Sequence, residues 1–408
     1  MKKKLITLLG IICLVLILVA CAAPAPSPAP APAKPIVLGY LACFTGSSAA
    51  TNPWQLNAIE LAIADIGGQI NGRPIKLVSE DTASDEATSV DKARKMVEVD
   101  KADVLFGPLP ASGAAAVSAY TTPLGILHMG ICEWMLTSLK LAKTELAPDG
   151  THKGTGYYVG LYAYDVLGAR TATVIHDDIS FAEDFTQGAM DGFASRGGTI
   201  IQRQRPPIFE QDYASYLTAI KKADVVIYWF VPPNAFRFNQ QFQQYGLTMP
   251  RAQGGCTSMG DQMQQDLGEK AVGIVSAASC DAGVDTPEVK AFIDRWTEMF
   301  GDKSPEKGNY PEYNEGLTQY NTVYIYLQAV KALNGDTTPD KVADVLLSQK
   351  FDTPWGKVSF DSNGVGVGNK YVMKITNVNG KYIRTAAKVY EQISRDEPAE
   401  AKDKAPKM

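Results

Sequence analysis

Residues 54–81, WQLNAIELAIADIGGQINGRPIKLVSED, contain the pattern that decides the fold. The opening segment WQLNAIELAIADI predicts a helix, and residues 70–74 (INGRP) combine an Asn-Gly pair with a proline, which is typical of a turn. Residues 75–81 (IKLVSED) then predict a strand. Together with the apolar strand predicted over 35–44 (PIVLGYLACF), the stretch predicts two strands joined by a helix, as in a parallel sheet.

This alternation continues along the chain and then starts again. In the first half we expect a helix over 84–100, a strand over 102–108, a helix from Ser112 and a strand over 123–131. In the second half we expect a strand over 169–178, a helix over 181–197, a strand over 199–204, a helix from Asp212 and a strand over 223–230. Apolar strands separated by helices indicate parallel sheets covered on both faces.

A short internal match supports two similarly built lobes. Residues 101–104 (KADV) recur as residues 222–225, and each copy opens a predicted strand. The sequence therefore predicts an α/β protein with two doubly wound, Rossmann-like lobes. A long helix is expected over 316–333, followed by short hairpin strands over 356–360, 371–377 and 381–389.

The N-terminus has the features of an export signal. Three lysines precede an apolar run over 5–20, which is too short and wrongly flanked for a membrane span. Residues 18–21 (LVAC) resemble the bacterial lipobox, which implies that residues 1–20 are a signal peptide and that Cys21 is lipidated. An ordinary secretion signal is the alternative. Residues 21–35 alternate Pro with Ala, which predicts an extended spacer of about 40 Å.

Composition limits the class of protein. The chain has 408 residues, of which 45% are hydrophobic, and this length favours two domains over one core. The net charge of −5 and the lack of a Lys/Arg stripe argue against nucleic acid as a partner. Residues 391–408 are rich in charged residues and Pro, which predicts a disordered tail.

Four cysteines remain once Cys13 is removed with the signal and Cys21 is lipidated: Cys43, Cys132, Cys256 and Cys280. We favour a disulfide between Cys256 and Cys280, and the alternative is a reduced, buried set.

No reaction centre is recognisable in the sequence, which lacks a nucleophile elbow, a Walker loop and a His-Glu-x-x-His motif. His128, His152 and His176 do not have metal-ligand spacing. We expect His128 and His176 to pack within strands and His152 to lie in a loop. The Asp177-Asp178 pair precedes a predicted helix, so capping explains it better than acid–base chemistry. We therefore expect no metal, no cofactor and no enzymatic activity.

The export signal, the spacer and the twin lobes resemble the substrate-binding lipoproteins of ABC importers. More narrowly, the chain resembles the branched-chain amino-acid (Leu/Ile/Val)-binding family of type I periplasmic binding proteins. The likeness covers nearly all of residues 36–390. Its carriers are LACFTGSSA (41–49), the segment 57–97 that contains ELAIADI and INGRPIKLV, VLFGPLPASG (104–113), ATVIHDDISFAEDF (172–185) and QYNTVYIYLQAVKAL (319–333).

The resemblance implies two lobes joined by a three-segment hinge, with crossings near Gly154, Asp281 and Phe351. Lobe 1 would consist of residues 36–153 plus 282–350, and lobe 2 of residues 154–281 plus 351–390.

The resemblance also implies a ligand pocket between the lobes. Ser112, with Ala111 beside it, matches the serine that binds the ligand carboxylate. The other matching positions are Gly130, Ile131 and Cys132 after the fourth strand, Phe181 at a helix start, Val231 and Cys256 in later loops, and Tyr320 in the long helix. Two alternatives remain open: Ser112 as a helix cap and Tyr320 as a core residue.

The sequence departs from the amino-acid binders at two positions. Cys132 stands where the family usually has Thr, and no carboxylate lies near Cys256 to pair the ligand ammonium. A buried ammonium without a partner is costly, so an α-amino acid would need another acid, of which Glu133 is the nearest candidate.

Aromatic residues gather at or beside the predicted strand ends: Trp54, Trp134, Trp229, Phe181 and Phe230. We expect about half of them to face the cleft and the rest to be core. The hypothesis is a hydrophobic or aromatic carboxylate as ligand, with Ser112 and backbone donors on the carboxylate.

The expected function is ligand capture by hinge closure for an ABC importer, with permease and ATPase subunits as partners. We expect a monomer held outside the cytoplasm by its lipid anchor. The alternatives are a ligand sensor that signals to a receptor, a strict branched-chain amino-acid binder, and an enzyme that uses Cys132 or Cys256 as nucleophile.

Overall fold

The computed structural model describes residues 33–46, 49, 52–109, 111–131, 142–256, 258–301, 314–396 and 398. The signal peptide, Cys21 and most of the spacer lie outside these residues, as do Cys132, Glu133 and Trp134. Predictions that fall on those positions therefore remain predictions.

The first sheet consists of β1 (Ile36–Ala42), β2 (Gln69–Ile70), β3 (Arg73–Asp81), β4 (Val104–Phe106), β5 (His128–Met129) and β6 (Glu145–Leu146). Its order is β2-β3-β1-β4-β5-β6, and all neighbours except β2 and β3 are parallel. Every residue of β1 is buried, which fits a strand covered on both faces. The strand expected over 123–131 is shorter than predicted, because Thr122–Leu124 form a 3-10 turn before β5.

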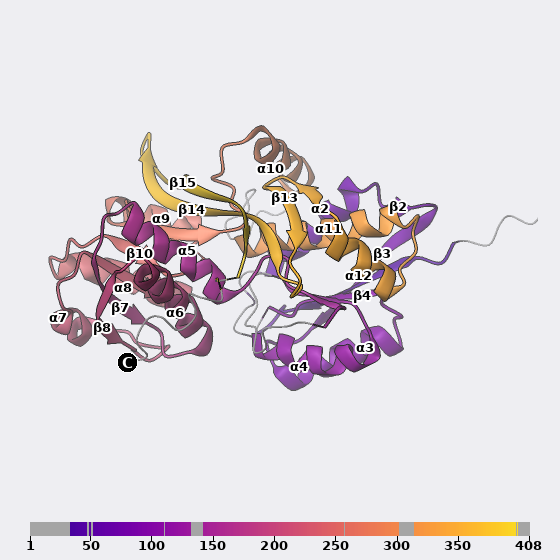
Figure 1. The fold of residues 1–408 in the computed structure, drawn as a ribbon, viewed down its shortest axis with the longest axis horizontal. Helices are drawn as coiled ribbons and strands as arrows, with labels where there is room; N and C mark the ends of the chain where they lie inside the picture. The colour runs from indigo at the N-terminus through magenta and orange to yellow at the C-terminus, as the bar shows by residue number, and fades with distance from the viewer. Residues whose placement is uncertain are drawn as a thin grey trace, which may run out of the picture. The chain divides into compact units, whose positions relative to one another are not determined.

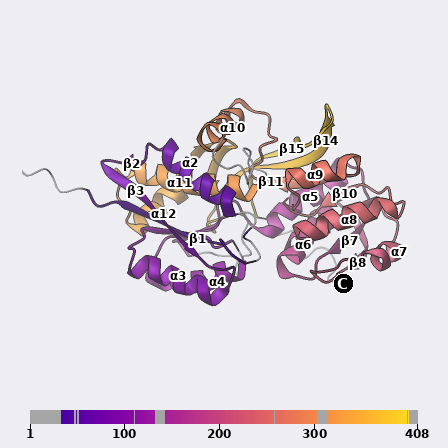
Figure 2. The same cartoon turned by 180° about the vertical axis from the view of Figure 1, so that it is seen from behind.

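The helices of this part are α2 (Asn52–Asp65), α3 (Glu86–Glu98), α4 (Ala111–Thr121), α10 (Pro287–Phe300), α11 (Asn314–Ala332) and α12 (Pro339–Ser348). α3 and α4 lie side by side, and α2 packs against α11 (Figures 1 and 2). The predicted turn at 70–74 is an Asn-Gly hairpin between β2 and β3. Asn71 and Gly72 have φ of 49° and 75°, as a two-residue hairpin turn requires.

The second sheet consists of β7 (Thr171–His176), β8 (Thr199–Gln204), β9 (Val225–Trp229), β10 (Arg251–Gln253), β11 (Val275–Ala278), β12 (Phe351–Thr353), β13 (Gly356–Phe360), β14 (Gly366–Val378) and β15 (Lys381–Ser394). The path is β12-β13-β14-β11-β10-β9-β7-β8, and β15 pairs with β14. Strands β7 to β11 are mutually parallel where they pair, and β12 to β15 form the antiparallel addition.

The helices of this part are α5 (His152–Asp165), α6 (Ser180–Ser195), α7 (Ala214–Ala219), α8 (Pro232–Gln244) and α9 (Asp261–Leu267). α5 and α6 pack at backbone distance, because glycines remove side chains from their contact. A Cβ on Gly160 would lie 2.0 Å from the Ala189 carbonyl oxygen, and one on Gly188 would lie 2.0 Å from that of Lys153.

The KADV repeat marks the same structural position in both lobes. The Asp103 carboxylate accepts the backbone N–H of Val37 at 2.8 Å, and the Asp103 N–H donates to the Val37 carbonyl at 2.8 Å. The Asp224 carboxylate likewise accepts the N–H of Thr171 at 2.9 Å, and the Asp224 N–H donates to the Thr171 carbonyl at 3.1 Å. In each lobe the aspartate before the central strand thus fixes the start of the lobe's first strand.

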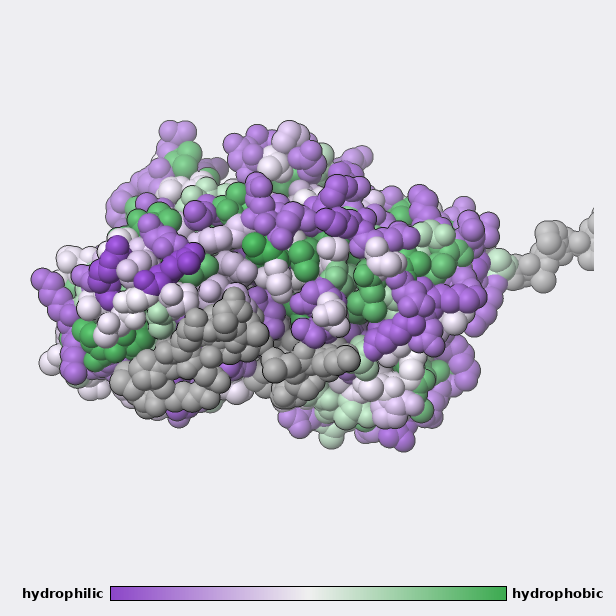
Figure 3. Space-filling view, in the orientation of Figure 1, coloured by the Kyte–Doolittle hydropathy of each residue, from purple (hydrophilic) through white to green (hydrophobic). Residues whose placement is uncertain are grey.

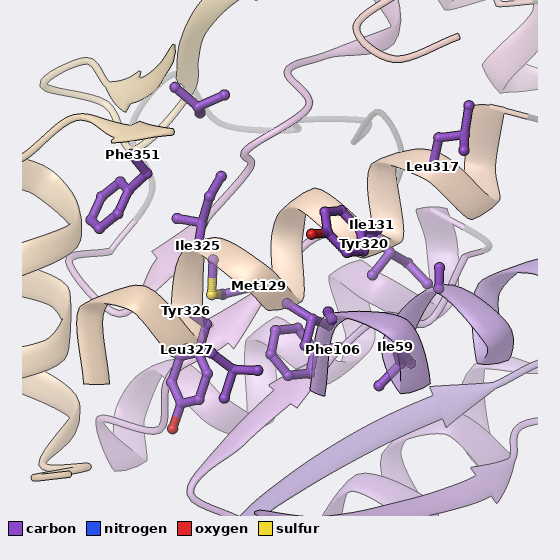
Figure 4. Close-up of a cluster of buried hydrophobic side chains, with 14 of the residues drawn as sticks. Ile59, Phe106, Met129, Ile131, Leu317, Tyr320, Ile325, Tyr326, Leu327 and Phe351 are labelled. Carbon is purple, nitrogen blue, oxygen red and sulfur yellow. The ribbon is translucent and has the colours of Figure 1, made fainter. Parts of the chain in front are cut away.

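An apolar core lies against each sheet. In the first lobe, Phe106 packs edge-to-face on Tyr326 at 5.7 Å, with Ile59 and Met129 beside them (Figure 4). In the second lobe, Val174 and Ile227 belong to the core under α5 and α6. On the face drawn in Figure 3, hydrophilic residues cover much of the described surface, and hydrophobic groups are scattered among them.

The side chains of Phe351, Trp355 and Val358 belong to the core that contains Ile36 and Phe106, whereas Val372 belongs to the second-lobe core. The first-sheet core therefore extends beyond residue 350. The domain boundaries themselves remain predictions.

The predicted start of the disordered tail, residue 391, is too early. Strand β15 continues to Ser394, and Arg395 is only 1% exposed. The Arg395 guanidinium donates to the carbonyls of Pro148 at 2.8 Å and Asn369 at 3.1 Å. Charged composition predicted disorder here, but these buried hydrogen bonds attach residues 391–396 to the fold.

Candidate ligand-binding site

The predicted residues of the first lobe follow two neighbouring parallel strands, β4 and β5. Ala111 and Ser112 are the first residues of α4, and the Ser112 side chain is exposed. Gly130 follows β5, and its carbonyl accepts the Thr322 hydroxyl of α11 at 3.4 Å. Because β4 and β5 are parallel, both loops lie at the carboxyl edge of the sheet, where α/β folds bind ligands.

Ile131 belongs to this edge only through its backbone. Its side chain is fully buried in the core near Tyr320 (Figure 4). A Cβ on Gly107 would lie 2.9 Å from the Ile131 Cδ1, which shows how closely the side chain packs under the loop after β4.

A buried histidine joins the two loops. His128 Nε2 lies 2.6 Å from the Gly107 carbonyl, and Nδ1 lies 3.2 Å from the Ser118 hydroxyl. Burial lowers the pKa of His128, so the ring is neutral near pH 7. The predicted packed role of His128 within a strand is confirmed.

The predicted residues of the second lobe lie in an aromatic cluster. Trp229, at the end of β9, packs edge-to-face on Phe181 at 5.1 Å and stacks on Phe185 at 5.3 Å. The Trp229 indole N–H donates to the Cys256 carbonyl at 3.2 Å, so the loop after β10 joins the same cluster. Phe181 is partly exposed, whereas Phe185 and Cys256 are buried.

His152 belongs to this cluster, although the sequence prediction placed it in a loop. It is the first residue of α5, and its ring lies 4.5 Å from that of Phe185. The helix starts here because the Thr151 hydroxyl accepts the Gly154 N–H at 2.9 Å, which is an N-cap. A Thr ahead of a helical pattern was the signal that could have found this start.

Asp177 hydrogen-bonds to the start of α8 at the second edge. Its carboxylate accepts the Val231 N–H at 2.7 Å and the Asn234 side-chain N–H at 2.8 Å. Val231 is the N-cap residue of α8, so Asp177 caps α8. The prediction that it caps the helix following it in sequence is wrong. Burial raises the pKa of Asp177 to about 6.

Tyr320 packs in the core of the first lobe. The side chain is 1% exposed, and its hydroxyl donates to Asp65 at 2.7 Å. The ring packs on Phe292 at 4.8 Å and stacks on Tyr324 at 5.2 Å. This is the arrangement of the core alternative; contact with a ligand remains a prediction.

The other aromatic candidates divide between the two expected classes. Phe230 is buried among Tyr213 and Phe238, which is core packing. Trp54 is 9% exposed and lies against Gly316 of α11. Of the aromatic candidates within the described residues, Phe181 and Trp229 take part in the cluster at the second edge.

The favoured disulfide is wrong. Cys43, Cys256 and Cys280 are buried, and none of these three forms a disulfide with another. Cys280 accepts the Asn321 side-chain N–H at 3.0 Å instead.

No helix among the described residues is long and apolar enough to cross a membrane. In the same part of the chain, no three His, Cys, Asp or Glu side chains converge as a metal site would require.

Comparison with known proteins identifies the fold family. A family model described as periplasmic binding protein matches residues 35–381. The chain belongs to the periplasmic binding protein family. Membership makes it an extracytoplasmic solute-binding protein and not an enzyme, as predicted.

Three similar proteins illustrate this membership. An amino acid binding protein of Pseudomonas aeruginosa is 25% identical over 358 residues, covering 85% of this chain and 91% of that protein. An ABC transporter substrate-binding protein from Sphaerobacter thermophilus has a TM-score of 0.81 at 21% identity, covering 89% of this chain and 99% of that one. A solute binding protein of an ABC transporter from Rhodopseudomonas palustris, in complex with 3,4-dihydroxy benzoic acid, has a TM-score of 0.77 at 20% identity, covering 88% and 98%. The two structures confirm the predicted fold of two α/β lobes.

Proposed function

We propose that this periplasmic binding protein is the substrate-binding component of an ABC importer and captures a small hydrophobic or aromatic carboxylate. The aromatic cluster at the second edge carries the proposal. Phe181 is partly exposed there and packs on Trp229, which in turn stacks on Phe185. Aromatic faces suit a flat apolar ligand body better than a small charged one.

The first edge supplies groups that suit the carboxylate. Ser112 presents an exposed hydroxyl in the first turn of α4, where unpaired backbone N–H groups favour an anion. Closure of the lobes would place the aromatic body against Phe181 and the carboxylate against Ser112. The ligand drives closure only by its higher affinity for the closed state.

The remaining parts of the proposal are the lipid anchor at Cys21, the spacer and a monomeric protein that delivers its ligand to permease and ATPase partners. The permease contact is supported by the two ABC-transporter proteins of the same fold. Loss of cellular uptake of the bound acid when the protein is deleted would distinguish an importer from a sensor.

A branched-chain amino-acid binder is the second candidate, and the amino acid binding relative in Pseudomonas aeruginosa favours it. Such a ligand needs a carboxylate for its ammonium. Asp184 lies one turn after Phe181. Burial raises the pKa of its carboxyl, and the positive charge of Lys153 offsets part of this increase. Because Lys153 already provides a positive charge to Asp184, this carboxylate is poorly suited to a ligand ammonium.

Calorimetric titration of the full-length protein would decide between the candidates. We expect benzoate or 4-hydroxybenzoate to bind with a Kd of about 1 μM or tighter, which is about −8 kcal/mol, and leucine to give no heat. Tight leucine binding without binding of either aromatic acid would overturn the proposal.

A further inference from the structure

Helix α11 carries an unusual run of buried polar residues. Residues 316–323 are all buried, so this part of the helix is enclosed on every side. A helix enclosed in this way normally carries apolar residues. Four members of the run are nevertheless polar and no more than 3% exposed: Thr318, Gln319, Asn321 and Thr322.

Several amide atoms in this region lack hydrogen bonds. Gln319 is fully buried, and neither its oxygen nor its nitrogen has a partner among the described residues. On the neighbouring helix α2, the fully buried Gln55 accepts the Tyr40 hydroxyl at 2.7 Å. The Nε2 of Gln55 has no partner among the described residues.

Helix geometry places Gln319 toward the ligand edge of the first sheet. Gly316 lies against Trp54 at the start of α2, since a Cβ there would be 2.8 Å from the Trp54 Cβ. Thr322 reaches the Gly130 carbonyl after β5. Gln319 is three residues from each, so it projects between α2 and the loop after β5.

These unpaired groups are costly. A buried polar group without a hydrogen bond costs about 1–3 kcal/mol, so natural folds rarely keep several together without a reason. Gln55 and Gln319 each offer an unpaired donor, and Gln319 also offers an unpaired acceptor. A carboxylate can only accept hydrogen bonds, whereas a hydroxyl both donates and accepts.

We propose that Gln319, with Gln55 across from it on α2, forms a polar subsite that binds a hydroxyl group of the ligand. This inference rests on the proposed function and narrows its substrate class to hydroxylated aromatic carboxylates. If ordered water pairs these amides instead, they have a purely structural role, and the test distinguishes that outcome.

The test compares 4-hydroxybenzoate with benzoate, which differ by one hydroxyl, in calorimetric titrations of the full-length protein. We expect the wild type to prefer 4-hydroxybenzoate at least about tenfold, because benzoate leaves the amides unpaired. Gln319→Met keeps the side-chain length but removes both hydrogen-bonding atoms. It should reduce the preference to within about threefold and leave benzoate affinity nearly unchanged.

Gln264→Met is the matched control. Gln264 is also fully buried, but it lies on α9 of the second lobe, where its Nε2 donates to the Met259 carbonyl. This variant should retain the wild-type preference. Gln55→Met provides a second test of the subsite if Gln319→Met does not unfold cooperatively.

Equal binding of the two acids by the wild type, or an unchanged preference in both Gln319→Met and Gln55→Met, would overturn the subsite and assign the amides to water. Either result would leave the proposed function intact. Absence of binding by both acids would instead overturn the proposed function, and the subsite with it.

Discussion

The carboxyl edges of the two sheets have the same architecture but opposite chemistry. Asp103 and Asp224 fix the first strand of each lobe by equivalent hydrogen bonds. Beyond the strand ends, the first edge has the exposed Ser112 hydroxyl and backbone groups, while the second has the partly exposed Phe181 packed on the buried Trp229. The shared features set where a ligand can bind. Under the proposed function, the residues that differ select a ligand with a polar end and an apolar body.

The largest effect is expected from breaking the aromatic edge. Phe181→Ala removes the partly exposed ring of the cluster, so affinity for an aromatic carboxylate should fall about 10- to 100-fold. Calorimetric titration measures this loss. The stability cost should be smaller than for a fully buried ring, because Phe181 is already partly exposed.

Phe236→Ala is the matched control for this prediction. Phe236 is a partly buried phenylalanine of the same lobe, on α8, but it packs in a different apolar cluster from Phe181. An equal loss of affinity in both variants would show that general destabilisation, and not the aromatic edge, controls binding.

The sequence predicted elements better than orientations. The alternating pattern located both sheets, and the KADV repeat predicted equivalent strand starts, because both depend on local spacing. The family resemblance placed Phe181 at a helix start and Val231 in the loop after a strand, and the structure has both there. The sequence could not give the rotation of α11, where Tyr320 turns toward Asp65 and Thr322 toward Gly130. Residues 316–323 of this helix are buried on all sides, so they leave no apolar stripe from which to predict its orientation.

Other errors have the same origin in long-range contacts. Residues 391–396 have the composition of a tail, but the Arg395 guanidinium finds buried carbonyl acceptors at Pro148 and Asn369. Asp177 was expected to cap the next helix and instead caps α8, because β7 and β9 are neighbours in the sheet. Such contacts depend on which strands pair, and local sequence does not encode this directly.

An effect of intermediate size is expected on the pH dependence of folding stability. Asp177 lies at the second edge and His128 at the first, and burial shifts their pKa values in opposite directions. Burial raises the pKa of Asp177 from 3.8 to about 6. The folded protein thus binds this proton more tightly than the unfolded chain. The stability that the protonated group contributes is fully present below about pH 4 and is lost as the pH rises through about 6. For His128 the pKa is lowered, so its contribution is present above pH 6.5 and is lost as the pH falls through the lowered value.

Asp177→Asn should remove the first of these dependences. Denaturant unfolding between pH 4 and pH 7 would measure it: the stability of the wild type relative to the variant should fall by on the order of 1–2 kcal/mol as the pH rises. Asp224→Asn is the control. Backbone hydrogen bonds from Arg170 and Thr171 lower the pKa of Asp224 below 3.8, so its contribution to stability changes only below that pH and the difference should be flat between pH 4 and pH 7. A flat difference for Asp177→Asn would show that this carboxyl titrates alike in the folded and unfolded states.

The smallest effect on binding is expected at Tyr320. Tyr320→Phe removes the hydroxyl that donates to Asp65, a carboxylate that Arg295 also holds at 3.0 Å. Unfolding free energy should therefore fall by about 1 kcal/mol, while ligand affinity stays within about twofold. Tyr324→Phe, on the stacked and less buried neighbour, should change neither quantity appreciably. A tenfold loss of affinity in Tyr320→Phe at unchanged stability would instead place the Tyr320 hydroxyl on the ligand. The first edge would then extend across α11 to the side that faces Asp65.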